Sequence, residues 1–144
     1  MSTPVQVTFD CADPERMAQF WVDVLGYRLP EPPDGFGTWE EWAVANRIPE
    51  DQWNAARAIE DPEGVGPRIY FQRVPEPKVV KNRVHLDVNV GGGRTTPLEQ
   101  RKANVGREVE RLMALGATQV GPVQERDEYW VVMRDPEGNE FCLQ

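Results

Sequence analysis

The only histidine of the chain lies in the alternating segment 84–89, Val-His-Leu-Asp-Val-Asn. Successive side chains of a strand point to opposite faces, so His85 and Asp87 are expected on the same face. A neighbouring carboxylate orients an imidazole and stabilises its charged form. The pair is therefore a candidate for acid–base catalysis on a bound small molecule, or for holding a polar ligand without chemistry. A single histidine excludes a histidine-rich metal site and a two-histidine relay.

A second polar face is predicted near the start of the chain. Residues 5–10 also alternate, and Gln6, Thr8 and Asp10 share one side of that strand. Asn89 continues the polar side of the first segment. Polar groups that face an enclosed space are costly unless they meet water, each other or a ligand. We therefore predict that the two polar faces line a ligand cavity, with an ordinary water-exposed sheet face as the alternative.

Tryptophans give a further indication of a ligand. Trp39 and Trp42 lie in the segment 37–45, which we predict to be a strand. Aromatic side chains at the mouth of a cavity suit a flat or apolar ligand. Core packing or a dimer interface explains them equally well.

Landmarks that would position these residues occur twice in the same order. The motif Asp-Pro-Glu-Gly occurs at 61–64 and 135–138, in each case read as a type I turn. A Leu-Gly pair ends each of two amphipathic helix patterns. The repeat predicts a duplicated module of about half the chain. Module one spans about 1–74, the linker 75–82, and module two about 83–144.

Each module is expected to contain a strand, a helix and three further strands. The first helix, about 14–25, begins with Asp13 as its N-cap. The second, about 97–115, begins with a capping box in which Thr96 is the N-cap. Residues 49–58 interrupt the repeat, and residues 49–56 favour a short helix that module two lacks. The predicted strands are at 4–10, 27–29, 37–45, 69–74, 83–90, 117–121, 128–134 and 139–143.

Composition limits the classes of function. The 144 residues suffice for one domain with a sizeable core. The formal net charge of −8 disfavours nucleic acid and anionic membrane surfaces as partners. No apolar run has transmembrane length, and we expect no signal peptide. Two cysteines, Cys11 and Cys142, make no disulfide framework, so a cytoplasmic protein is expected.

The whole pattern resembles a known superfamily. A βαβββ module that occurs twice, with Asp-Pro-Glu-Gly before each last strand, is similar to the vicinal oxygen chelate proteins. These include glyoxalase I, extradiol dioxygenases and bleomycin-resistance proteins. The stretches 13–26, 81–87 and 135–143 are most similar to the glyoxalase-like branch. The resemblance implies an α+β fold in which two βαβββ modules form a barrel-like cavity within a single domain, 1–144. It also implies a small-molecule ligand and a homodimer.

The resemblance also implies where a metal would bind. In metal-dependent members, the ligands come from the first and last strands of each module. The matching positions here are Gln6, Tyr70, His85 and Cys142, with Glu140 as a backup ligand. A glyoxalase-type site needs carboxylates, and the matched positions lack them. We therefore expect a pocket without a metal that includes Tyr70, with a divalent metal as the alternative.

Three functions follow as hypotheses. The first is a glyoxalase-like protein that binds, and in the enzymatic case transforms, a small organic molecule. The second is a metal-dependent lyase or isomerase of the glyoxalase type. The third is a resistance protein that sequesters an antibiotic. His85 and Asp87 are the residues predicted to carry any catalytic step.

Overall fold

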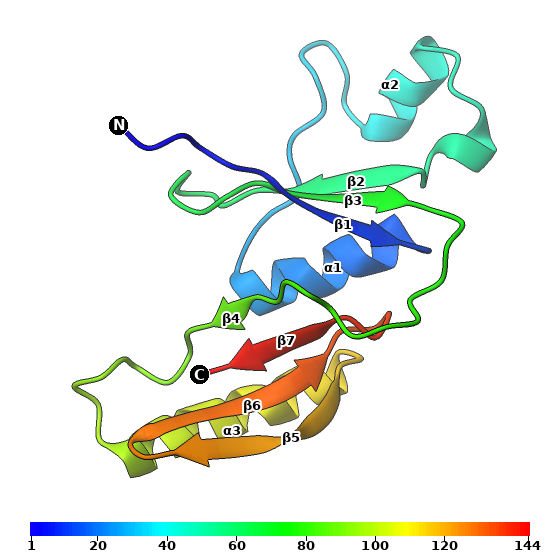
Figure 1. Cartoon of the computed structure of the whole chain (residues 1–144). Coiled ribbons are helices and arrows are strands. Elements are labelled where there is room, and N and C mark those ends of the chain that lie inside the picture. Colours follow the sequence, from blue (N-terminus) through cyan, green and yellow to red (C-terminus); the bar gives the residue numbers. More distant parts are fainter. The chain divides into compact units, whose positions relative to one another are not determined.

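The computed structural model describes residues 1–144 and divides into two units, Met1–Pro77 and Lys78–Gln144. The division falls inside the polar, proline-containing stretch 75–82. Figure 1 shows that each unit has its own sheet with a helix packed on it. None of the helices combines the length and the apolar character needed to cross a membrane.

The first unit has a three-stranded sheet in the order β1-β3-β2. β1 runs parallel to β3, and β2 runs antiparallel to it. Arg28 adds an isolated antiparallel bridge to Glu60, just beyond the end of β2. The elements are β1 (Val7–Cys11), α1 (Pro14–Leu25), α2 (Trp39–Ala45), the 3-10 helix η1 (Glu50–Gln52), β2 (Ala56–Ile59) and β3 (Ile69–Arg73).

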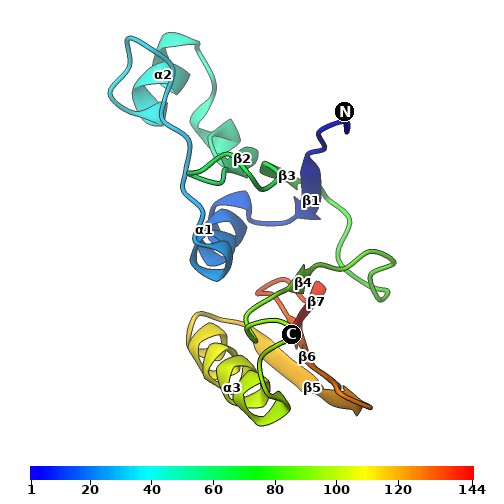
Figure 2. The same ribbon diagram turned by 90° about the vertical axis from the view of Figure 1, so that its left-hand side faces the viewer.

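The second unit has a four-stranded sheet in the order β4-β7-β6-β5. Its opening strand again lies parallel to its last strand, and the other pairs are antiparallel. The elements are β4 (Asp87–Val88), α3 (Leu98–Ala114), β5 (Thr118–Glu125), β6 (Glu128–Arg134) and β7 (Glu140–Leu143). Figure 2 shows α3 against one face of this sheet. The shared strand order confirms the predicted α+β fold of two related modules.

Local signals explain α1, which spans the predicted residues. The Asp13 carboxylate accepts a hydrogen bond from the backbone N–H of Arg16 at 3.3 Å, and Gly26 ends the helix in the left-handed region. The apolar stripe is buried at every position against the sheet. It consists of Met17, Phe20, Trp21 and Val24. Burial of such a side chain contributes about 1.5–3 kcal/mol, so this face holds the helix on the first unit's sheet.

The capping box predicted for the second helix is wrong. The Thr96 hydroxyl donates to the carbonyl of Gly92 at 2.8 Å, so it does not cap the helix. Pro97 occupies the N-cap position, and α3 begins at Leu98 without a side-chain cap. Packing holds this helix instead, because Val105, Val109 and Leu112 are buried.

The strand predicted at 37–45 is also wrong, because these residues form α2. The Thr38 hydroxyl accepts a hydrogen bond from the N–H of Glu41 at 3.1 Å. The Glu41 carboxylate accepts one in return from the N–H of Gly37 at 2.7 Å. This reciprocal capping stabilises a helix start and overrides the strand preference of the tryptophans.

Other predicted strands are shorter or shifted. The segment 27–29 contributes only the bridge at Arg28, and the predicted helix 49–56 becomes η1 followed by the start of β2. The strand predicted at 83–90 shrinks to β4, whose two residues pair with Cys142 and Leu143 of β7. Strand length depends on the partner, and a single segment does not reveal the partner.

Candidate functional site

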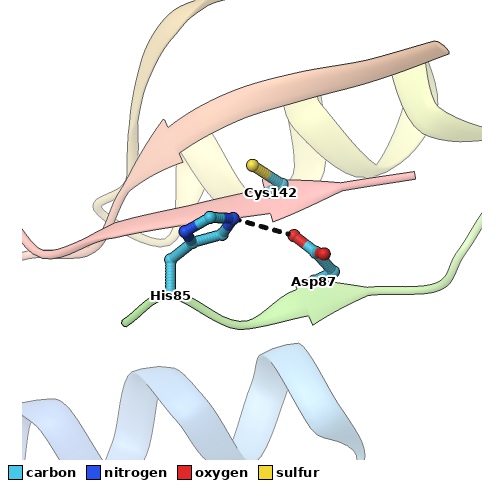
Figure 3. A group of neighbouring side chains, drawn as sticks. All are labelled: His85, Asp87 and Cys142. Carbon is cyan, nitrogen blue, oxygen red and sulfur yellow. Dashed lines mark ion pairs between the residues drawn. The ribbon is translucent and has the colours of Figure 1, made fainter. Parts of the chain in front are cut away.

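His85 and Asp87 lie together on one face of the second unit's sheet (Figure 3). The His85 Nε2 is 3.3 Å from the Asp87 Oδ1, and the two side chains are 42% and 47% exposed. The alternation of the segment 84–89 accounts for this placement, as predicted. The imidazole is thus oriented by a carboxylate while remaining open to solvent.

Cys142 joins this pair through strand pairing. β4 and β7 run parallel with Asp87 opposite Cys142, so the two side chains share a face. Potential ligand atoms of His85, Asp87 and Cys142 all lie within 4.8 Å of one another. Burial raises the pKa of the Cys142 thiol, and the Asp87 carboxylate raises it further, while Lys81 opposes the shift. The thiol is therefore protonated at neutral pH and is not a poised nucleophile.

The other polar residues of this face already have partners. Asn89 accepts a hydrogen bond from the Gln144 amide at 3.0 Å. The Glu140 carboxylate accepts one from the backbone N–H of Asn82 at 3.0 Å and lies 3.3 Å from the Lys78 ammonium. Burial acts to raise the pKa of Glu140, but these hydrogen bonds and the Lys78 charge lower it overall. Glu140 is therefore held as a charged partner of Lys78.

The polar face of the first unit has a different character. The Gln6 carbonyl oxygen accepts a hydrogen bond from Arg68 at 2.5 Å, and the Arg68 guanidinium lies 5.6 Å from the Tyr70 ring centroid. Thr8 is paired with Tyr70 across β1 and β3. Asp10 accepts a hydrogen bond from Gln72 at 2.7 Å. A cation, Arg68, thus contacts both of the positions that the resemblance matched to metal ligands in this unit.

A divalent metal is the cofactor that the fold implies, and the side chains fit it in part. His85, Asp87 and Cys142 supply nitrogen, oxygen and sulfur donors, a set that suits Zn²⁺. Gln6 and Tyr70 suit a metal less, because the Arg68 charge beside them repels a cation. The three donors of the second unit are therefore the residues that would hold a metal.

The tryptophans predicted to contact a ligand lie on a helix. Trp39 and Trp42 are both in α2, with ring centroids 5.6 Å apart in an edge-to-face arrangement. The Trp39 indole N–H donates to the carbonyl of Pro30 at 3.0 Å. These contacts explain both side chains as packing of the insertion, and Trp39 keeps an exposed side.

Two participants were missing from the prediction. Asp87 was identified as a partner of His85 but not as a potential metal ligand, because its register with Cys142 is set by a distant strand. Arg68 was not identified at all. The signal was present, since Arg68 is two residues before Tyr70 and strand alternation puts both on one face.

Comparison with known families gives one match over nearly the whole chain. The family model of the Glyoxalase-like domain matches residues 6–144. Among curated protein sequences, none matches.

Solved structures with a similar fold come from several bacteria. A glyoxalase/bleomycin resistance protein/dioxygenase family enzyme from Burkholderia phytofirmans PsJN has 20% identity and a TM-score of 0.60, over 96% of this chain and 94% of that one. TioX from Micromonospora sp. ML1 has 21% identity and a TM-score of 0.52, over 99% and 97%. The fosfomycin resistance protein FosX from Listeria monocytogenes, in complex with Mn(II) and 1S,2S-dihydroxypropylphosphonic acid, has 12% identity and a TM-score of 0.62, over 100% and 90%. At these identities the likeness shows a shared fold.

Proposed function

Because this chain belongs to the glyoxalase-like family of the vicinal oxygen chelate superfamily, we propose that it binds a small organic molecule through the polar sheet face around His85. The observation that carries the proposal is the exposed His85–Asp87 pair beside the buried Cys142 thiol. The ligand is expected to have a polar group that accepts a hydrogen bond from the imidazole or donates one to it.

The chemistry of the pair follows from its geometry. The Asp87 carboxylate holds the Nε2 side of the His85 ring, which leaves Nδ1 for a ligand. An imidazole in this position takes up or delivers a proton on the bound molecule, as a lyase or isomerase step requires. The neutral Cys142 thiol adds a weak donor. If no step follows binding, the same contacts sequester the ligand, as in a resistance protein.

The second candidate is a metal-dependent lyase or isomerase, and the His85, Asp87 and Cys142 donors favour it. A bound metal would polarise an oxygen of the substrate as a Lewis acid. Listeria FosX was solved with Mn(II) and an organic phosphonic acid, so that protein combines the fold with a metal and a small organic ligand. We keep the metal-free site as the leading proposal, because the first unit places a guanidinium at its two matched positions.

A ligand screen tests the leading proposal. Small organic molecules are screened by thermal shift, and the affinity of each hit is measured by tryptophan fluorescence. His85→Ala and Asp87→Asn should weaken binding by about tenfold or more, the value of a lost hydrogen bond to a charged group. Gln124→Ala, an exposed change on β5 of the same sheet, is the matched control and should leave affinity unchanged. Unchanged affinity in His85→Ala would contradict the proposal.

Metal analysis separates the two candidates. The protein is purified without chelators and its metal content is measured, with His85→Ala and Cys142→Ala alongside. The leading proposal expects no stoichiometric metal. One equivalent of Zn, Ni, Mn or Fe that both variants lose would establish the metal-dependent reading instead. Turnover of a bound hit then distinguishes an enzyme from a sequestering protein.

We also propose that the chain forms a homodimer and acts in the cytoplasm. The insertion 36–58 supports the homodimer, because Trp39 and Val44 on α2 are exposed apolar residues that the other module lacks. Sedimentation at micromolar concentration tests it. A single species near 16.4 kDa would contradict the dimer.

A further inference from the structure

Arg68 is held over the polar face of the first unit's sheet by two contacts. Its guanidinium donates to the Gln6 carbonyl oxygen at 2.5 Å. It also lies 5.6 Å from the Tyr70 ring centroid, within the range of a cation–π contact. The backbone of Arg68 is fixed as well, because its carbonyl accepts from the N–H of Val7 at 3.1 Å. A long, flexible side chain is thus given a defined position on a sheet face.

This guanidinium has no carboxylate partner. Some arginines of the chain form ion pairs, among them Arg28 with Glu60 and Arg111 with Glu108. Arg68 forms none, although the chain has eight more acidic than basic residues. The nearest acidic side chain along β1, Asp10, accepts from Gln72 instead. No carboxylate of the protein is therefore in contact with the positive charge of Arg68.

The donors of Arg68 are also largely unused. A guanidinium carries five N–H donors in a planar fork, and Gln6 accepts from one of them. A fork with free donors recognises a carboxylate or a phosphate-type group through two parallel hydrogen bonds. Thr8, opposite Tyr70 in the strand pairing, adds an exposed hydroxyl to the same face. Charge and geometry thus both favour an oxyanion.

We propose that Arg68, supported by Gln6, Thr8 and Tyr70, forms an oxyanion subsite that binds the carboxylate or phosphonate group of a small organic acid. The proposal goes beyond the proposed function, because Arg68 lies in the first unit and His85 in the second. The subsite should bind acids more tightly than their neutral analogues.

The probes are propionate, methylphosphonate and the neutral propionamide, each titrated into the whole protein and followed by NMR chemical shifts. Both anions should shift the signals of Gln6, Thr8, Arg68 and Tyr70, and propionamide should not. Arg68→Gln should weaken anion binding at least tenfold. Arg68→Lys, which keeps the charge but loses the fork, should retain part of it. Arg94→Gln removes one positive charge from an exposed loop position and should change nothing.

Two results would overturn the subsite. One is equal shifts with propionamide, since the site would then not recognise charge. The other is anion binding that survives in Arg68→Gln or falls equally in Arg94→Gln, because net charge alone would then explain it. The His85→Ala variant separates this proposal from the function above. Anion binding at Arg68 should persist in the His85→Ala variant. Either proposal can therefore fail while the other stands.

Discussion

The two units share a strand order but carry opposite chemistry on their polar faces. In both, the opening strand lies parallel to the last strand, and the apolar side of the sheet packs under one helix. The polar face of the first unit presents the Arg68 cation over Tyr70. The polar face of the second presents the His85–Asp87 pair and a neutral thiol. The fold demands only the apolar faces, so the polar faces are free to differ in function.

The units also differ in how much of the sheet is built. The second unit has an eight-residue outer strand, β5, whereas the first has only the bridge between Arg28 and Glu60 beyond β2. In the first unit, α2 and η1 occupy the intervening chain. The two modules therefore differ most in this stretch of the chain. Substitutions of equivalent residues in the two modules show how much each residue contributes to the free energy of unfolding.

The largest paired effect is expected in the two cores. Phe71 in β3 and Phe141 in β7 are 0% and 1% exposed, and Phe71 also contacts the Phe9 ring edge-to-face at 5.3 Å. Phe71→Ala and Phe141→Ala should each lower the free energy of unfolding by about 3–5 kcal/mol, through lost burial and a remaining cavity. Urea unfolding followed by circular dichroism measures this.

Val79→Ala is the control for the core variants, since Val79 is 83% exposed. It should leave the urea midpoint unchanged. A loss below about 1 kcal/mol in either phenylalanine variant would mean that this unit relaxes around the cavity. The two units would then differ in packing as well as in surface chemistry.

The two Asp-Pro-Glu-Gly turns should respond unequally to loss of their aspartates. Asp135 is 3% exposed, and its Oδ1 accepts from the N–H groups of Glu137 and Asn139, each at 3.0 Å. Asp135→Ala leaves these donors buried without a partner, at a cost of about 1–3 kcal/mol. Asp61 also accepts from backbone N–H groups, but water reaches its turn and replaces the carboxylate. Asp61→Ala should therefore cost less.

Thermal melts of both alanine variants and of Asp135→Asn check this inequality. The asparagine keeps an acceptor oxygen and should restore most of the lost stability. Equal losses in Asp61→Ala and Asp135→Ala would show that burial does not distinguish the turns.

The glycines that end the two helices offer a finer comparison. Gly26 has φ 69°, inside the left-handed region that asparagine tolerates. Gly116 has φ 112°, outside that region. Gly26→Asn should be nearly neutral, whereas Gly116→Asn should cost about 1–3 kcal/mol in backbone strain. The urea midpoints of the two variants measure this difference in stability. An unchanged midpoint in Gly116→Asn would mean that the backbone relaxes at this turn.

The parts of the fold that depend on nearby residues were predictable from the sequence. The caps, the apolar stripe and the closing glycine of α1 all lie within fourteen residues of the chain, 13–26. The placement of His85 beside Asp87 was predictable for the same reason, since it requires only alternation. The reciprocal capping of Thr38 and Glu41 was equally local, but the prediction of a strand at 37–45 did not take it into account.

The parts that depend on distant partners were not predictable from local pattern. The extent of β4 is set by its pairing with Cys142 and Leu143 of β7. The position of Cys142 opposite Asp87 came from the family resemblance only in part, because the register joins residues far apart in sequence. The role of Arg68 required knowledge that Gln6 lies beside it, across two parallel strands. Sequence alternation gives the face of a residue but not its neighbours on that face.

The smallest paired effect concerns the helix starts. Asp13 caps α1, whereas the Thr96 hydroxyl donates to the Gly92 carbonyl and leaves α3 uncapped. Asp13→Ala should therefore cost about 1 kcal/mol at neutral pH, the usual value of an N-cap. Thr96→Ala is the matched control and should cost less, because it removes no cap. Urea unfolding of both variants measures the difference.

The pH dependence of that difference tests its cause. The hydrogen bond from Asn54 chiefly lowers the pKa of Asp13 below its usual 3.8, against the effect of burial and with help from the Arg16 N–H. A carboxyl whose pKa is depressed in the folded protein stabilises it above the unfolded value and loses that contribution as pH falls through the folded value. The loss of unfolding free energy in Asp13→Ala should therefore be largest at about pH 6 and should become smaller below about pH 3.8. The loss of unfolding free energy in Thr96→Ala should not change with pH. A loss of stability in Asp13→Ala that stays constant into acid would mean that the charge of the carboxylate does not support the cap.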